Sequence, residues 1–328
     1  MRLNEIVNDW NSGRDVTIKT SGSTGKPKTI QLPHELIRWS ANNTKKALRL
    51  NHENVLICID VNKIGGRMMM YRSLIFDWEY SVVSPSADPM ATIHQKHSYT
   101  FVSLVPYQLD YILRNPESLK KLLRFTNVLL GGSKVSSTLL SKIQELGTDT
   151  NTQFWHSYGM TETASHIALR NLSNKQSKFK ALDGVYLSLS EHNTLVIEIP
   201  DVGISVSTND VVELYPDGFE YLGRVDDVVN SGGIKLQLHD VEHQINQAIH
   251  PIDLTFFCWK VDDERLGEKL VFVGIKTQNQ AKIEERIKHR LQSVCTPKLF
   301  LWTDEFDYLE SGKIDREKTV KRLIEIGS

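Results

Sequence analysis

The sequence predicts an α/β protein whose first domain is a mixed α/β unit, with a largely parallel sheet and a small antiparallel layer, followed by a smaller α+β domain. Three observations support this. The 328 residues exceed the roughly 150 residues of a typical domain about twofold. Short β-branched runs alternate with longer amphipathic stretches over the first two-thirds, as in parallel strands joined by helices. Closely spaced strands follow from about Gly184, and a further unit begins after Gly223. We therefore expect domains at residues 1–223 and 224–328.

The parallel sheet is predicted from six short β-branched or apolar runs. They lie at residues 16–19, 55–60, 80–83, 100–105, 127–130 and 153–156. Longer amphipathic stretches predict helices at residues 33–48, 67–76, 107–114 and 136–146. Strands separated by helices of this length pair in parallel, because a parallel pair needs a crossover connection.

The antiparallel layer is predicted from four short strands that follow one another without helices. They lie at residues 185–189, 195–199, 211–215 and 219–221. Turn residues such as Asn193 and Gly218 separate them. In the second unit we expect helices at 239–248 and 281–291, strands at 255–259 and 270–275, and a turn at Gly232 and Gly233.

Composition excludes several classes of protein. Lys and Arg number 39 against 40 Asp and Glu, so the formal charge is −1. The protein therefore has no net positive electrostatic field that would attract nucleic acid. Hydrophobic residues make up 40% and charged residues 24%, which is ordinary for a globular protein and unlike a disordered one. The longest apolar runs are far shorter than the roughly 20 residues of a membrane helix, so we expect no membrane span.

The compartment is predicted from the N-terminus and the cysteines. Charged and amide residues interrupt the first ten positions, so no signal-peptide core is present and a cytoplasmic location is expected. Cys58, Cys258 and Cys295 are few and widely spaced. This pattern argues against a disulfide framework or a zinc knuckle and favours incidental thiols.

The strongest local signal is a segment rich in glycine and hydroxyl groups. It comprises Thr20, Ser21, Gly22, Ser23, Thr24, Gly25, Lys26, Pro27 and Lys28. Glycines let the backbone approach phosphate oxygens, hydroxyls add donors, and the lysines supply positive charge. Only two residues separate the glycines, so the segment is not a kinase-type P-loop. The alternative is a solvated hairpin loop, since exposed loops have a similar composition.

The segment resembles the phosphate loop of the adenylate-forming superfamily, and three further motifs follow in the family's order. Residues 158–162 (Tyr-Gly-Met-Thr-Glu) resemble its nucleotide motif, and residues 223–227 with Gly232 and Gly233 resemble its hinge. Residues 311–316, which include Lys313, resemble its C-terminal lysine loop. The resemblance implies a mobile C-terminal domain. Only 19 residues precede Thr20, so the first domain is expected to be truncated relative to the family.

Individual residues of these motifs acquire expected roles in binding ATP and Mg²⁺. A turn at Tyr158 and Gly159 offers an aromatic face for adenine, Thr161 a hydroxyl for phosphate, and Glu162 a carboxylate for Mg²⁺; the alternative is a capped helix N-terminus. The resemblance implies further contacts to the nucleotide from Gly131, Gly132, Ser133, Asp210, Arg224 and Gly233. It also implies a pivot at Asp226 and a catalytic role for Lys313.

A second group of residues is expected near the acid. Residues 155–168 look most like o-succinylbenzoate-CoA ligases of menaquinone synthesis. Lys63, Arg67, Arg72 and His166 flank the expected acyl pocket and could bind a second carboxylate through charge-assisted hydrogen bonds. The alternative is that Arg67 and Arg72 merely cover a helix surface.

The resemblance implies a two-step ligase for an aromatic dicarboxylate. In the first step the acid reacts with Mg-ATP to give an acyl-adenylate and pyrophosphate. In the second, the thiol of coenzyme A displaces AMP. Another aryl- or acyl-CoA ligase, an enzyme that loads a carrier protein, and a nucleotide-binding regulatory module stay open as alternatives. The oligomeric state, including a homo-oligomer, also stays open.

Overall fold

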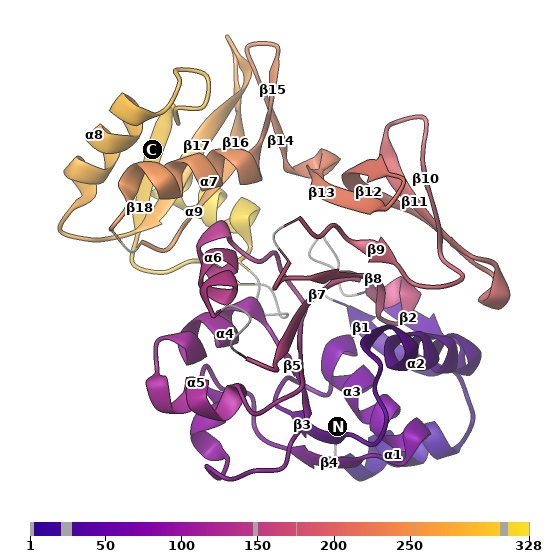
Figure 1. The fold of residues 1–328 in the computed structure, drawn as a ribbon. Helices are drawn as coiled ribbons and strands as arrows, with labels where there is room; N and C mark the ends of the chain where they lie inside the picture. The colour runs from indigo at the N-terminus through magenta and orange to yellow at the C-terminus, as the bar shows by residue number, and fades with distance from the viewer. Residues whose placement is uncertain are drawn as a thin grey trace.

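The computed structural model describes residues 3–20, 28–146, 150–174, 176–252, 254–308 and 314–327. Its strands form three main sheets and one hairpin (Figure 1). The hairpin pairs β1 (Val16–Thr20) with β2 (Lys28–Leu32) in antiparallel register. In the described part of the chain, no helix has the length and the unbroken apolar character that a membrane span needs.

The largest sheet has seven strands in the order β4-β3-β5-β6-β7-β8-β9. Its strands are β3 (Asn54–Ile57), β4 (Glu79–Val82), β5 (Phe101–Leu104), β6 (Asn127–Leu130), β7 (Gln153–Gly159), β8 (His166–Asn171) and β9 (Lys180–Ala181). The first five pair in parallel, and β8 and β9 join in antiparallel fashion. The prediction of a largely parallel sheet is confirmed, but the strand expected in it at residues 16–19 is wrong, because that segment is β1 of the antiparallel hairpin.

Helices cover both faces of this sheet, which is why its central strands are apolar throughout. Val55 and Ile57 of β3 pack in one core with α1 (Leu3–Asn11), α2 (His34–Leu48) and α3 (Ile64–Phe76). Leu56, on the same strand, packs in a second core on the other face. That core includes α4 (Pro106–Leu113), α5 (Pro116–Leu122) and α6 (Ser137–Glu145). The alternation of side chains along one strand therefore separates the two cores.

The second sheet is the predicted antiparallel layer. It runs β10 (Tyr186–Leu189), β11 (Thr194–Ile199), β12 (Ile204–Tyr215) and β13 (Gly218–Arg224), each antiparallel to the next. Its core shares Ile167 and Ala168 with β8 of the large sheet. Phe179 adds a bridge to Phe219 of β13. These contacts fix the layer beside β8 and β9 (Figure 1).

The third sheet is built from residues after 227. It contains β14 (Val228–Ser231), β15 (Ile234–Gln237), β16 (Phe256–Asp263), β17 (Gly267–Ile275) and β18 (Leu299–Thr303). The helices α7 (Leu238–Ile249) and α8 (Gln280–Arg290) pack on one core, and α9 (Arg316–Gly327) packs on another through Val320. Only the short turn η5 (Val225–Asp227) separates β13 from β14.

Most predicted elements are confirmed within a few residues of their expected ends. The sequence analysis did not identify α1, β2, α5, β8, β9, β14, β15, β18 or α9. The turn expected at Tyr158 and Gly159 is wrong, because both residues belong to β7 and the chain turns after them, at η3 (Thr161–Thr163). Glycine is still needed at position 159 for a steric reason, because a Cβ there would lie 2.3 Å from the carbonyl oxygen of Ser165.

Candidate nucleotide and acid site

The described residues place the strands that flank the predicted phosphate segment beside the nucleotide motif, at one edge of the large sheet. Ser21, Gly22, Ser23, Thr24, Gly25, Lys26 and Lys313 lie outside the described residues. The strands that flank the phosphate segment are described, and Thr20 pairs with Lys28 across the hairpin. Strand β2 contacts η3, which carries Thr161 and Glu162. The phosphate segment therefore begins and ends on a hairpin that packs against the nucleotide motif.

The nucleotide motif forms a tight reversal between β7 and β8. Ala164 ends η3 with φ of 59°, an uncommon value for a residue other than glycine. The hydroxyl oxygen of Thr163 lies 3.1 Å from the carbonyl oxygen of Met160 and donates to that of Ser165, at 2.7 Å. These contacts hold the reversal closed. Thr161 is half-buried and Glu162 is exposed at its surface.

Glu162 fits the chemistry of a magnesium site that is completed by nucleotide phosphates. Mg²⁺ is usually held by one or two carboxylates together with phosphate oxygens and water, not by an all-protein cage. Among the described residues no group of three acidic, His or Cys side chains could hold a metal ion. A single exposed carboxylate beside the phosphate-loop hairpin is compatible with this chemistry.

Gly131, Gly132 and Ser133 follow β6 at the same edge of the sheet. Gly132 has φ of 84°, and a Cβ on Gly131 would lie 2.9 Å from the hydroxyl oxygen of Ser157. The next strand reaches this loop through His156, whose Nε2 lies 3.2 Å from the carbonyl oxygen of Ser133. Burial lowers the pKa of His156 to about 4, so the neutral ring donates this hydrogen bond. Loops after adjacent parallel strands form the usual ligand crevice of such sheets.

Four residues with separately predicted roles form one hydrogen-bonded network. The hydroxyl of Tyr158 donates to Asp210 Oδ2 at 2.5 Å, and Arg224 Nη1 lies 3.1 Å from Asp210 Oδ1. Arg224 also donates from Nε and Nη2 to the two carboxylate oxygens of Asp226, each at 2.9 Å. Burial alone would raise the pKa of Asp226, but the hydrogen bonds from Arg224 leave it below its ordinary value. Arg224 thus links the residues predicted for ribose and for the hinge.

The predicted acid-binding residues fall into separate environments. Lys63 is exposed and precedes α3. Arg67 is buried and donates to the carbonyl oxygen of Val61 at 2.8 Å and to the hydroxyl of Tyr71 at 3.4 Å. Arg72 and His166 are both buried and meet at a common partner, Ser165. The alternative in which Arg67 and Arg72 cover a helix surface is wrong, because both are almost fully buried.

Arg72 is a buried cation that is paired with no carboxylate of the described residues. Its Nη2 donates to Ser165 Oγ at 2.8 Å, and its Nη1 lies 4.0 Å from the sulfur of Met69. Its Nε has no hydrogen-bond partner among the described residues. The ion pairs that form among the described residues do not include Arg72. Burial lowers the pKa of Arg72 to about 9, so the side chain still carries its charge at neutral pH.

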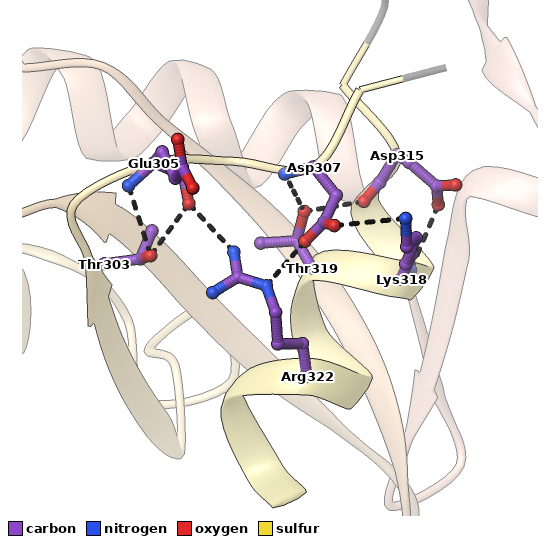
Figure 2. Close-up of polar contacts among 7 residues, drawn as sticks. All are labelled: Thr303, Glu305, Asp307, Asp315, Lys318, Thr319 and Arg322. Atoms are coloured by element: carbon purple, nitrogen blue, oxygen red, sulfur yellow. Dashed lines mark hydrogen bonds and ion pairs between the residues drawn. The ribbon is translucent and has the colours of Figure 1, made fainter. Parts of the chain in front are cut away.

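The two ends of the lysine loop are held by a compact polar cluster (Figure 2). Tyr308 pairs with Ile314, and the amide of Asp315 donates to the carbonyl oxygen of Asp307 at 2.8 Å. The carboxylate of Asp307 accepts from Arg322 Nε at 2.7 Å and lies 3.4 Å from Lys318 Nζ. We call these contacts around Asp307 the lysine-loop stem.

Sequence reasoning missed three residues at these sites. Ser165 and Thr44 flank His166 in space; Ser165 lies within residues 155–168 but was given no role, and no motif marks Thr44. Lys134 follows the glycine loop, with its ammonium 4.4 Å from the centre of the Tyr221 ring. Burial lowers the pKa of Lys134 to about 8 against the attraction of Asp240 and other acidic groups. Gly233, which the sequence analysis assigned to the nucleotide, lies in the β14–β15 turn with φ of 82°.

Comparison with protein families supports the motif resemblance. A family model described as AMP-binding enzyme matches residues 16–188. The 2-succinylbenzoate–CoA ligase of Listeria monocytogenes is 26% identical over 97% of this chain and 72% of its own length. The enzyme of the same name from Staphylococcus aureus is 24% identical over 91% of this chain. This chain spans 65% of the length of that relative.

Solved structures with the same fold include a protein of similar length. An acyl-CoA synthetase (AMP-forming)/AMP-acid ligase II-like protein from Dyadobacter fermentans is 35% identical, with a TM-score of 0.62. The match covers 97% of this chain and 93% of that one. The o-succinylbenzoate CoA synthetase of Bacillus subtilis, solved with its acyl-adenylate intermediate, has a TM-score of 0.79 at 23% identity. That match covers 92% of this chain and 68% of the other.

Proposed function

Because the chain belongs to the AMP-binding enzyme family, we propose that it activates o-succinylbenzoate, an aromatic dicarboxylate, with Mg-ATP and transfers the acyl group to coenzyme A. A carboxylate oxygen attacks the α-phosphorus of ATP, and the bond to pyrophosphate breaks. The thiolate of coenzyme A then attacks the acyl carbon, and AMP leaves with that oxygen. AMP is needed because oxide is a poor leaving group.

Arg72 is the observation that supports a dicarboxylate. Arg72 is 2% exposed, and its guanidinium is not paired with a carboxylate in the described part of the chain. A buried charge without a partner destabilises the native state by several kcal/mol. A second carboxylate on the substrate would supply the missing anion and could accept two parallel hydrogen bonds from the guanidinium. The nearby reversal that carries Thr161 and Glu162 would hold the reacting end of the same molecule.

The remaining residues have roles in binding the nucleotide and neutralising its charge. In this proposal Glu162 holds Mg²⁺, which would polarise the phosphates and neutralise developing charge. Tyr158, Asp210 and Arg224 hold the adenosine, together with the loop at Gly131. Lys313 donates to the reacting oxygens during the first step.

The domain boundary proposed at residues 223 and 224 falls beside the Arg224–Asp226 pair. We propose that the C-terminal domain turns about Asp226 between the two steps, so that Lys313 acts in the first step only. A pivot of this kind absorbs a change in backbone dihedral angles. The salt bridge from Arg224 to Asp210 joins the two sides of the proposed boundary, and the one from Arg224 to Asp226 lies on its C-terminal side.

A coupled pyrophosphate assay across a panel of acids tests the proposal. We expect pyrophosphate release with o-succinylbenzoate, and a free acyl-CoA product when coenzyme A is added. Benzoate, which lacks the second carboxylate, should be a poor substrate because it leaves Arg72 unpaired. Transfer to a carrier protein but not to coenzyme A would favour a carrier-loading enzyme. Absence of pyrophosphate release with every acid would favour a regulatory module.

A further inference from the structure

A continuous chain of hydrogen bonds leads from α2 through β8 to Arg72 on α3. Thr44 Oγ1 donates to the carbonyl oxygen of Ser40 at 2.8 Å, and His166 Nε2 lies 3.1 Å from Thr44 Oγ1. On the opposite side of the ring, His166 Nδ1 lies 3.2 Å from Ser165 Oγ. That oxygen accepts from Arg72 Nη2 at 2.8 Å. We call Thr44, His166 and Ser165 the arginine relay.

The directions of the hydrogen bonds in the relay follow from its chemistry. Thr44 has one hydroxyl hydrogen and directs it to Ser40, so His166 Nε2 must be a donor. Burial, aided by the charge of Arg72, lowers the pKa of His166 well below 6.5, so the ring is neutral. Nδ1 then carries a lone pair and accepts from the hydroxyl of Ser165. The same hydroxyl oxygen can accept from Arg72.

We infer that the arginine relay positions the guanidinium of Arg72 to bind the second carboxylate of the acid, an inference that rests on the proposed function. In this arrangement His166 is a positioning residue. Both of its ring nitrogens are engaged within the protein, so it acts through Ser165 and does not touch the substrate. This differs from the direct contact to the acid that the sequence analysis expected.

Arg72 needs such a support because its other contacts are weak. The thioether of Met69 is a poor acceptor at 4.0 Å, and Nε has no partner among the described residues. Ser165 Oγ is therefore the strong acceptor that fixes a side chain with several rotatable bonds. Fixing it before the substrate binds reduces the entropy that binding would otherwise lose.

The relay also connects Arg72 to the nucleotide motif. The carbonyl oxygen of Ser165 accepts from the hydroxyl of Thr163 at 2.7 Å, inside the reversal after β7. Ser165 follows Ala164, whose positive φ depends on the contacts that hold this reversal. One short segment therefore sets both the position of Glu162 and the orientation of Arg72. The two ends of the bound acid would then be held at a fixed position relative to each other.

Substitution of Ser165 tests the relay through a separation of kinetic constants. Ser165→Ala removes the acceptor of Arg72, so the KM for o-succinylbenzoate should rise about tenfold with a smaller change in kcat. The KM for benzoate should not change. Ser73→Ala is the matched control, because Ser73 is a buried serine next to Arg72 whose hydroxyl donates to the carbonyl of Met69 instead. Its KM for o-succinylbenzoate should match that of the wild type.

Two substitutions of His166 separate the bonds on either side of the ring. The amide oxygen of Asn lies close to the position of Nδ1, so His166→Asn should still accept from Ser165 and keep the KM within about threefold. The amide nitrogen of Gln lies close to the position of Nε2, so His166→Gln keeps only the bond to Thr44. It should behave like Ser165→Ala. Equal effects of the two substitutions would refute the inference.

The tautomer of His166 provides a readout that does not depend on activity. Nitrogen-15 spectra of histidine-labelled protein should show a neutral ring with hydrogen on Nε2, assigned by its loss in His166→Asn. A hydrogen on Nδ1, or a ring that titrates near pH 6.5, would refute the relay. If the wild type does not discriminate between o-succinylbenzoate and benzoate, the proposed acid is wrong. If it discriminates and Ser165→Ala does so equally well, the relay alone is wrong.

Discussion

At the residue scale, Arg72 combines burial with a positive charge, and this combination is unfavourable unless an anion binds. Its side chain is almost fully buried, and burial brings its pKa down to about 9. The pKa nevertheless stays above neutral, so the native protein carries a buried charge that no carboxylate of the described residues pairs. Residues that oppose stability in this way are common at functional sites, because function and stability make different demands.

Replacing Arg72 by a hydrophobic side chain of similar length should separate stability from activity. For Arg72→Met we expect the free energy of unfolding to stay equal or to rise by about 1–4 kcal/mol, because a buried unpaired charge is removed. The kcat/KM for o-succinylbenzoate should fall by about a hundredfold as a charge-assisted contact is lost. Urea unfolding and pyrophosphate release measure the two effects. A strongly destabilised variant that retains selectivity would show that Arg72 supports the fold.

His156 predicts a loss of stability in mild acid. Its pKa is about 4 in the folded protein and about 6.5 when unfolded. The unfolded state therefore binds an additional proton between these values, and the free energy of unfolding falls as the pH drops from 6.5 towards 4. His156→Gln can still donate to Ser133 and should show a smaller fall between pH 7.5 and pH 5 in urea titrations. Identical pH dependence in both proteins would contradict this assignment.

Residues of the site differ in how far sequence could identify them. Tyr158, Asp210 and Arg224 belong to motifs, so the sequence analysis selected each of them, and the structure adds that they share one network. Thr44 lies 122 positions from His166. No local pattern marks such a contact, since it exists only after α2 packs beside β8. The arginine relay was therefore not predictable from sequence.

At the element scale, periodicity predicted the elements that are long or fully buried. Strand β6 was predicted with its observed ends, since the apolar run Val128 to Leu130 directly follows Asn127 and all four residues are buried. Strand β2 was missed because it is short and runs directly into α2. Helix α1 was missed although Leu3, Ile6, Val7 and Trp10 follow the spacing of an amphipathic helix, because the first ten residues were considered only as a possible signal peptide. Strand β2 is defined by its pairing with β1 more than by local preference.

The lysine-loop stem predicts a selective effect on the first step. Asp307 holds both ends of the segment that contains Lys313, so Asp307→Asn should weaken its pairing with Arg322 and Lys318. We expect pyrophosphate release to fall about tenfold, while thioester formation from synthetic acyl-adenylate and coenzyme A persists. Asp304→Asn is the control, because Asp304 forms an exposed pair with Lys276 nearby. Equal losses in both steps would mean that Asp307 supports the whole domain.

At the scale of the whole molecule, two of the sheets contribute residues to the proposed nucleotide site, and the third sheet begins directly after it. Asp210 lies on β12, Tyr158 on β7, and Arg224 at the end of β13, just before the third sheet begins. The fold class followed from the alternation of elements. The proposed pivot at Asp226 did not, because a change of domain orientation leaves no pattern in the sequence apart from the resemblance of the hinge motif.

Activation of the acid by transfer of AMP can be tested by following the carboxylate oxygen of the acid into the products. The wild-type protein is incubated with o-succinylbenzoate labelled with ¹⁸O in its carboxylates, together with Mg-ATP and coenzyme A. The attacking oxygen stays on the α-phosphorus when the thiol displaces AMP. Mass spectrometry should therefore find one ¹⁸O atom in AMP, with none in pyrophosphate. Unlabelled AMP, or label in inorganic phosphate accompanied by ADP, would contradict the account.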